Sequence, residues 1–260
     1  MDPTDELALE LAKLTGRPPN GSGNGFPEAE TVPAPMPILY GQGRLVKVSR
    51  TLLRQNRVVT ASEEGPSTDA YKILRTQVLH RLRENGWNVL GVTSPGKQEG
   101  KTTIAVNLGI SLAMEGNQTV LLVDADLRMP NVHRIFGLEG AQGLVDHLLD
   151  GAPIEDVLVN PDINRFLVLP GGRGVPGSAE LLTSPRMLAL AKELKHRYPS
   201  RLVLFDLPPL LDAADALAFS PHVDAILLVI EGGRTQTEQI ERALHLLKGT
   251  PIIGTVLNKG

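Results

Sequence analysis

From Ser67 onward, short apolar runs alternate with longer segments that place apolar residues on one helical face. The apolar runs are rich in Val, Leu and Ile, as is typical of buried parallel strands. This alternation predicts an α/β fold with a mostly parallel, doubly wound sheet and helices on both faces. We expect strands near residues 88–93, 119–124, 165–169, 201–206, 224–230 and 252–257. We expect helices near residues 68–84, 101–115, 142–149, 178–197, 211–219 and 235–248.

The segment that precedes this alternation has a different character. Residues 5–14 predict a short amphipathic helix, and residues 16–37, rich in Gly, Pro, Asn and Glu, predict a flexible, disordered linker. Residues 44–60 combine basic and apolar side chains, and we expect them to pack on the main domain. The chain is therefore divided into an N-terminal extension, residues 1–43, and one folded domain, residues 44–260.

The composition fits a single α/β domain with an aliphatic core. Of the 260 residues, 42% are hydrophobic but only 3% are aromatic, so Val, Leu, Ile and Ala must form most of the interior. The chain has no cysteine, which excludes disulfides and thiolate metal sites and fits a reducing compartment. No apolar run approaches the roughly 20 residues of a membrane-spanning helix, and the acidic N-terminus lacks a signal core. These features predict a cytoplasmic protein.

Charge is unevenly distributed along the chain. Residues 1–34 carry six acidic and two basic side chains, whereas residues 44–83 carry nine basic and three acidic ones. The basic stretch is compatible with a solvated helical face, a subunit contact or attraction to an anionic membrane surface. Nucleic-acid binding is not expected, because no aromatic side chains are interleaved with these charges.

The most informative segment joins an apolar strand to a helix through a loop that closes on Gly-Lys-Thr. Such a loop turns successive backbone N–H groups toward one point, and the helix adds the positive end of its dipole. Lys101 is expected to reach the β- and γ-phosphates of a nucleotide, and the Thr102 hydroxyl to bind Mg²⁺. The segment thus predicts a P-loop NTPase fold. The loop residues expected to contact the nucleotide are Gly96, Lys97, Gln98, Glu99, Gly100, Lys101, Thr102 and Thr103.

Charged residues follow two of the predicted strands directly. The strand at 119–124 runs into Asp124, Asp126 and Arg128, and alternation along an extended segment would put all three on one side. A charged side chain at the end of a buried strand costs free energy unless it is paired or has a function. We therefore take these residues, with Lys101, as catalytic candidates. We expect Asp124 to face the metal and phosphates, and Asp124 or Asp126 to accept the proton of an attacking hydroxyl.

Two further strand ends carry candidate ligands. Asp206 follows an apolar strand and is expected to hold Mg²⁺ together with Thr102 and Asp124. Asn258 ends the last predicted strand, where it is either a purine contact or a simple turn residue.

These motifs, in this order, resemble those of the bacterial tyrosine kinases. The segments that show this resemblance are Gly-x-x-x-Gly-Lys-Thr-Thr, Leu-Leu-Val-Asp-Ala-Asp-Leu-Arg-Met-Pro and Phe-Asp-Leu-Pro-Pro. The stretch from Tyr198 to Leu211 is similar to the exosortase-associated tyrosine autokinase branch, and residues 254–259 are similar as well. The resemblance covers about residues 44–260. It implies ATP as phosphoryl donor, Mg²⁺ as cofactor, a tyrosine hydroxyl as acceptor and a role in exopolysaccharide or capsule export.

The resemblance also implies partners. Family members form rings through a Glu-x-x-Arg-x-x-Arg helix, which here corresponds to Asp69, Lys72 and Arg75; Lys cannot make the forked contact of Arg. A second implied partner is the cytoplasmic tail of a membrane polysaccharide co-polymerase, which would hold the protein at the inner membrane. The family's acceptor tyrosines cluster in a C-terminal tail, whereas the tyrosines here, Tyr40, Tyr71 and Tyr198, are scattered.

Two other functions remain open at this point. One is a P-loop ATPase switch that binds a partner in its ATP state without phosphorylating tyrosine. The other is a non-catalytic module in which the nucleotide is a structural ligand.

Overall fold

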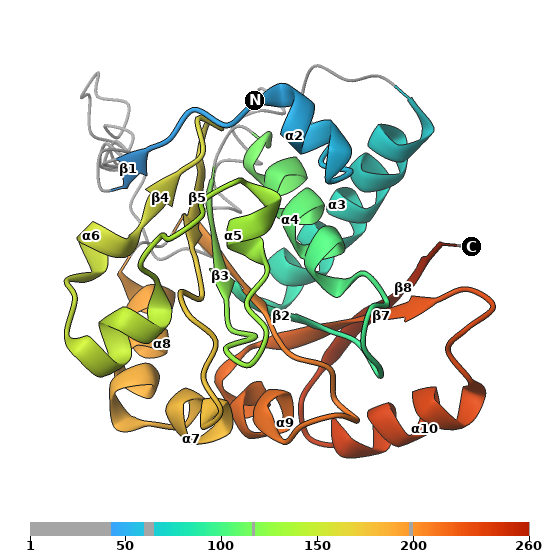
Figure 1. The fold of residues 1–260 in the computed structure, drawn as a ribbon. Helices are drawn as coiled ribbons and strands as arrows, with labels where there is room; N and C mark the ends of the chain where they lie inside the picture. The colour runs from blue at the N-terminus through green and yellow to red at the C-terminus, as the bar shows by residue number, and fades with distance from the viewer. Residues whose placement is uncertain (1–42, 60–64, 116–117, 198–199, 260) are drawn as a thin grey trace, which may run out of the picture. The chain divides into compact units, whose positions relative to one another are not determined.

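The structure is a computed structural model that describes residues 43–59, 65–115, 118–197 and 200–259 (Figure 1). The predicted helix at 5–14 and linker at 16–37 lie outside the described residues, and so does most of the proposed extension. The division at residues 43 and 44 therefore stays a prediction.

The predicted sheet is confirmed. Within the described residues it has eight strands in the order β1-β4-β5-β3-β6-β2-β7-β8, and every neighbouring pair is parallel except β4 and β5. The short strands β1 and β4 at one edge were not predicted from the sequence. The strand bounds are β1 Arg44–Leu45, β2 Val89–Thr93, β3 Thr119–Asp124, β4 Val159–Asn160, β5 Phe166–Leu169, β6 Arg201–Asp206, β7 Ala225–Glu231 and β8 Ile252–Asn258.

Helices cover both faces of this sheet, and two separate apolar cores result (Figure 1). Side chains alternate between the faces along each strand: Val120 and Leu122 pack beneath α3 and α4, whereas Leu121 and Val123 pack toward α7, α8 and α9. The helix bounds are α2 Arg50–Gln55, α3 Pro66–Asn85, α4 Lys101–Ala113, α5 Val132–Ile135, α6 Ile154–Val157, α7 Ser178–Leu182, α8 Pro185–His196, α9 Asp215–Phe219 and α10 Thr237–Leu246.

Three predicted helices differ from the observed ones. The helix expected at 178–197 is two helices, because Pro185 begins a new helix and the Ser184 hydroxyl caps it by accepting a hydrogen bond from Met187 N. The helix expected at 211–219 begins only at Asp215. Residues before it are held in another way: the Leu210 and Leu211 N–H groups bond to the carbonyls of Ser94 and Pro95.

The third difference concerns residues 142–149. Asp146–Asp150 form a π-helical turn, η1, instead of an ordinary α-helix. Gly143 N donates to Asp146 Oδ2 at 2.7 Å, which ties the start of the segment to the turn itself.

The carboxyl ends of the central strands bring the candidate residues to one edge of the sheet. Asp124 at the end of β3 pairs in register with Asp206 at the end of β6. Asp206 also stands opposite Val92, one residue before the end of β2. The phosphate loop and both strand-end carboxylates therefore meet at the same edge, as the parallel topology requires.

Candidate functional site

The phosphate loop connects β2 to α4 and has the conformation of an anion cradle. Gly100 has a φ of 90°, and a Cβ atom there would collide with the Asn258 side chain, so only glycine fits. Lys101 begins α4 directly after it, and the first-turn N–H groups of the helix have no intrahelical acceptors. The structure thus brings the predicted loop residues together at a helix N-terminus, where phosphate binding is favoured.

Side chains from distant segments hold this loop in place. The buried Glu99 carboxylate accepts hydrogen bonds from Gly96 N at 3.1 Å and from Thr235 Oγ1 at 2.7 Å. Asn258 Nδ2 donates to the Glu99 carbonyl at 2.8 Å, and Lys259 Nζ donates to the Gln98 carbonyl at 2.8 Å. Asn258 is therefore more than a turn residue. The Glu99–Thr235 contact was missed from the sequence, because it joins residues 136 positions apart.

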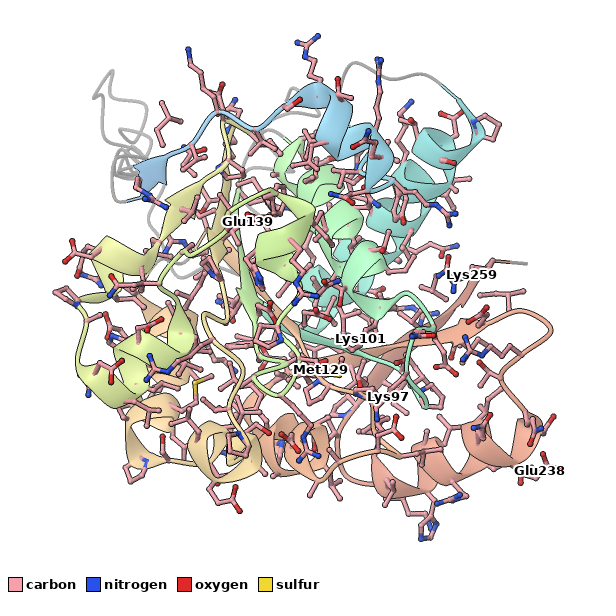
Figure 2. All side chains as sticks on the ribbon, viewed as in Figure 1. Lys97, Lys101, Met129, Glu139, Glu238 and Lys259 are labelled. Carbon is pink, nitrogen blue, oxygen red and sulfur yellow. The ribbon has the colours of Figure 1, made fainter. Side chains whose placement is uncertain are left out.

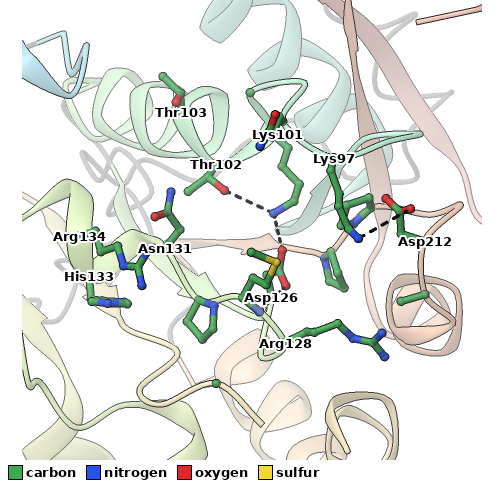
Figure 3. A pocket seen from close by; sticks show the side chains of 18 of the residues that line it. Lys97, Lys101, Thr102, Thr103, Asp126, Arg128, Asn131, His133, Arg134 and Asp212 are labelled. Atoms are coloured by element: carbon green, nitrogen blue, oxygen red, sulfur yellow. Dashed lines mark hydrogen bonds and ion pairs between the residues drawn. The ribbon is translucent and has the colours of Figure 1, made fainter. Parts of the chain in front are cut away.

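Lys101 lies between the carboxylates of Asp126 and Asp206 at the centre of the site. Figure 3 shows its contacts with Asp126 and Thr102. Its Nζ atom is 2.9 Å from Asp126 Oδ2 and 3.4 Å from Asp206 Oδ1. The Thr102 hydroxyl donates to Asp206 Oδ2 at 2.7 Å. Burial lowers the pKa of Lys101, but the charges of Asp206 and Asp126 outweigh it and raise the pKa overall, so the lysine is a cation.

The Asp124 side chain influences the site electrostatically, while its carboxylate oxygens accept hydrogen bonds from backbone N–H groups. Oδ2 accepts hydrogen bonds from Asn131 N and Val132 N, both at 2.9 Å. Full burial, followed by the charge of Asp206, raises the pKa of Asp124 to about 7. The carboxylate therefore fixes the loop that leads into α5, in addition to standing next to Asp206.

The alternation expected from Asp124 to Arg128 is wrong beyond residue 126. The chain turns there, with Met129 N donating to the Asp126 carbonyl at 3.1 Å. Arg128 instead approaches the buried Asp215, with 3.5 Å between Nη2 and Oδ2. Asp215 also accepts a hydrogen bond from the Ser178 hydroxyl, and neither residue was predicted from the sequence.

A hollow of about 770 Å³ opens over this cluster (Figure 3). Lys101, Thr102 and Asp126 line it on the phosphate-loop side. A second hollow of about 720 Å³ lies against the other side of the loop and is lined by Arg54, Tyr71 and Asn258, among others. Gly100, Thr103 and Lys259 line both hollows, so a ligand that spans the loop has room on either side.

The oxygen donors at this site suit a hard divalent cation that also binds phosphate oxygens and water. Among the described residues, no group of three or more His, Cys, Asp or Glu side chains could hold a metal alone. Mg²⁺ needs no such group, because it is usually bound by one or two carboxylates together with phosphate oxygens and water. The adjacent oxygens of Thr102 and Asp206 fit this pattern.

The predicted ring-forming residues lie on α3. Lys72 pairs with Asp69 at 2.9 Å within the exposed part of the helix. Arg75 instead turns inward and bonds to the Ser111 carbonyl and the Glu115 carboxylate, both at 3.2 Å. Within the described residues, no helix is both long and apolar enough to cross a membrane.

Comparisons with known proteins find related sequences and structures. Residues 90–260 match the CobQ/CobB/MinD/ParA nucleotide binding domain. Tyrosine-protein kinase YwqD of Bacillus subtilis is 33% identical over 208 residues, which cover 79% of this chain and 86% of YwqD. The succinoglycan biosynthesis transport protein ExoP of Rhizobium meliloti is 30% identical over 79% of this chain, which spans only 26% of ExoP. The crystal structure of the chimerical protein CapA2B2 superposes with a TM-score of 0.72 at 26% identity, covering 84% of this chain and 93% of that one.

Proposed function

The chain belongs to the bacterial tyrosine kinases, within the CobQ/CobB/MinD/ParA family of nucleotide-binding domains, and we propose that it transfers the γ-phosphoryl group of ATP to a tyrosine hydroxyl. The observation that carries the proposal is the position of Lys101, directly after the phosphate loop and within 2.9 Å of the Asp126 carboxylate. A phosphate-binding cation and a proton acceptor thereby stand side by side, as phosphoryl transfer requires.

The donor site is built from the loop and the start of α4. Backbone N–H groups between Lys97 and Thr103 bind the phosphates, and Lys101 neutralises charge on the β- and γ-phosphates. The base and ribose occupy the second hollow, where Asn258 and Tyr71 are among the lining residues. Lys259 lines both hollows, and Gln98 lines the first.

Thr102, Asp206 and Asp124 would hold the cation. When bound, Mg²⁺ would offset the negative charge that develops on the phosphate oxygens during transfer. Thr102 and Asp206 offer oxygens that already face each other at 2.7 Å. Asp124 supports them from the neighbouring strand end, next to Asp206.

Asp126 is the proposed proton acceptor. The tyrosine oxygen attacks the γ-phosphorus, the bond to the β-phosphate oxygen breaks, ADP leaves, and the tyrosine proton passes to Asp126. Lys101 holds this carboxylate in place before the reaction, because the two groups form a buried ion pair. Arg128 lies at the rim, where Asp215 holds it near the entering acceptor.

The biological setting is also a proposal. The name of ExoP supports a role in exopolysaccharide or capsule biosynthesis and export. We place the protein in the cytoplasm, at the inner membrane, bound to the cytoplasmic tail of a polysaccharide co-polymerase. Copies of the chain associate in a ring through Asp69, Lys72 and Arg75.

The test is mass spectrometry of the purified chain after incubation with ATP and Mg²⁺, alone and with a tyrosine peptide and the partner's tail. We expect site-mapped phosphotyrosine in the wild type and none in Lys101→Met. Lys192→Met, an exposed lysine on α8, is the matched control and should retain activity. ADP release without phosphotyrosine in every arm would contradict the kinase proposal and favour an ATPase switch.

A further inference from the structure

The entrance of the first hollow carries an excess of positive charge. Its rim includes Lys97, Arg128, Arg134 and Arg173, whereas Asp212 is the one exposed carboxylate among the lining residues that the structure describes. Asp126 also lines the hollow, but it is buried and paired with Lys101. The rim therefore favours an anionic group in addition to the nucleotide phosphates.

Most of these cations are already paired, and Arg134 differs from them. Lys97 stands 4.0 Å from Asp212, and Arg173 contacts Asp146 at 2.7 Å and Asp150 at 2.9 Å. Arg134 is exposed and makes no ion pair with any described residue. In Figure 3 it lies with His133 on the side of Asp126 away from Lys97. Its guanidinium is thus available for a carboxylate, which it can bind through two parallel hydrogen bonds.

Met129 gives the same entrance an apolar surface. Its side chain is 65% exposed although it is large and hydrophobic, and Pro130, Pro208 and Pro209 line the hollow with it. Figure 2 shows Met129 close to Lys101 and Lys97. The backbone N–H of Met129 donates to Asp126 Oδ1 at 3.1 Å, so the backbone of Met129 is held next to the proposed proton acceptor. A thioether at this place suits the edge of an aromatic ring.

We propose that this entrance selects tyrosines that lie in acidic segments. The tyrosine ring rests on Met129 and the neighbouring prolines while its hydroxyl reaches Asp126, and Arg134 binds a carboxylate that flanks the tyrosine. This assignment rests on the proposed function, because it names the acceptor class of the same site. The loop amides and Lys101 serve the donor phosphates from α4, whereas Met129 and Arg134 come from the segment after β3.

Binding measurements test this without requiring turnover. Fluorescent tyrosine peptides flanked by Glu, Gln or Lys are titrated by anisotropy against the full chain, saturated with a non-hydrolysable ATP analogue and Mg²⁺. We expect the Glu peptide to bind on the order of tenfold more tightly than the Lys peptide, with a preference that shrinks at high salt. Arg134→Gln should remove most of this preference. Arg242→Gln, an exposed arginine on α10, should keep it.

Substitutions of Met129 test the apolar surface of the entrance. Met129→Ala should weaken all three peptides by a similar factor, on the order of threefold to tenfold, and Met129→Leu should restore most of the loss. Leu244→Ala removes an exposed apolar side chain on α10 and should change nothing.

Two results would overturn the inference. One is equal affinity for the Glu and Lys peptides. The other is an Arg134→Gln protein that binds the ATP analogue less tightly but discriminates among the peptides as before, since Arg134 would then serve the donor. Phosphotyrosine formation is measured separately. Its absence, with peptide selectivity retained, counts against the kinase proposal; its presence without selectivity counts against this one.

Discussion

Thr235 Oγ1 and Glu99 Oε1 lie 2.7 Å apart, and this hydrogen bond fastens the phosphate loop to the segment between β7 and α10. The other oxygen of Glu99 accepts from Gly96 N, so the bond reaches the first glycine of the loop through one side chain. Thr235 Oγ1 in turn accepts from Glu231 N at 2.8 Å. The loop is thus held in shape by a chain of hydrogen bonds that begins at the end of β7.

Thr235→Val should therefore weaken nucleotide binding without touching a nucleotide contact. A hydrogen bond to a buried carboxylate contributes about 1.5–3 kcal/mol, which corresponds to a loss of affinity of roughly tenfold or more. Isothermal titration with an ATP analogue measures the loss. Thr250→Val, which removes a hydrogen bond to Ser220 away from the loop, is the control. Unchanged affinity in Thr235→Val would show that the loop keeps its shape without this contact.

Asp126→Asn should separate turnover from binding. Asn keeps an Oδ1 acceptor for Met129 N, so the turn after β3 is expected to persist. The variant has no carboxylate to take the tyrosine proton, and kcat should fall by about 10²–10⁴. Affinity for the ATP analogue should change only slightly. An equal loss in both measurements would mean that Asp126 serves the nucleotide and not the proton.

Asp124→Asn should change the pH dependence of stability in the nucleotide-free protein. The pKa of Asp124 rises from 3.8 to about 7 on folding, through burial and Asp206, so between these pH values the folded protein holds more protons than the unfolded chain. The free energy of unfolding must then fall as pH rises through this window, by at most about 1.4 kcal/mol per pH unit.

The variant lacks this titration, so its stability relative to the wild type should increase between pH 5 and pH 8. Urea unfolding in EDTA at the two pH values measures the difference. Asp156→Asn, at an exposed site on α6, is the control. A stability difference that stays constant with pH would contradict a raised pKa at Asp124.

The sequence predicted the central strands well because their ends are marked chemically. At 119–124 and 201–206 an apolar run gives way directly to Asp124 or Asp206, and both strands have the predicted bounds. The break at Pro185 was missed because apolar residues continue at helical spacing on both sides of it. Periodicity reports which face is buried and is insensitive to a change of helix axis.

The candidate site, too, was predicted only in part from the sequence. The phosphate-loop residues were predicted because they are contiguous and their spacing has a mechanical reason. The path of the chain to Arg128 was predicted wrongly, because a turn follows Asp126 where an extended segment was expected. Asp215 and Thr235 reach the site from other strand ends, and only the order of the strands in the sheet determines that they lie near it.

Lys72→Glu should shift any ring toward monomer. The Lys72 side chain is exposed and bonds only to Asp69 among the described residues, so reversing its charge should leave the fold intact. Arg75→Ala is a poorer probe, because Arg75 also fastens α3 to α4 through Ser111 and Glu115. Light scattering after gel filtration measures the mass. A mass unchanged from the wild type would place the subunit contact elsewhere.

Gly100→Ala tests whether nucleotide binding requires the observed conformation of the phosphate loop. The new methyl group would meet Asn258 Nδ2, and the residue would also have to hold a φ of 90°, which L-residues rarely adopt. The variant should lose measurable nucleotide affinity. Gly177→Ala, where φ is −90° and the added Cβ has only an ordinary contact, should bind as the wild type does.

A double-mutant cycle with Asn258→Ala separates the two causes. Asn258→Ala alone removes the hydrogen bond to the Glu99 carbonyl and should cost about 1 kcal/mol of binding. If the collision dominates, Gly100→Ala with Asn258→Ala should bind more tightly than Gly100→Ala alone. If backbone strain dominates, the second substitution should weaken binding further. Wild-type affinity in Gly100→Ala would contradict the phosphate-cradle assignment, because the loop conformation it requires is closed to alanine.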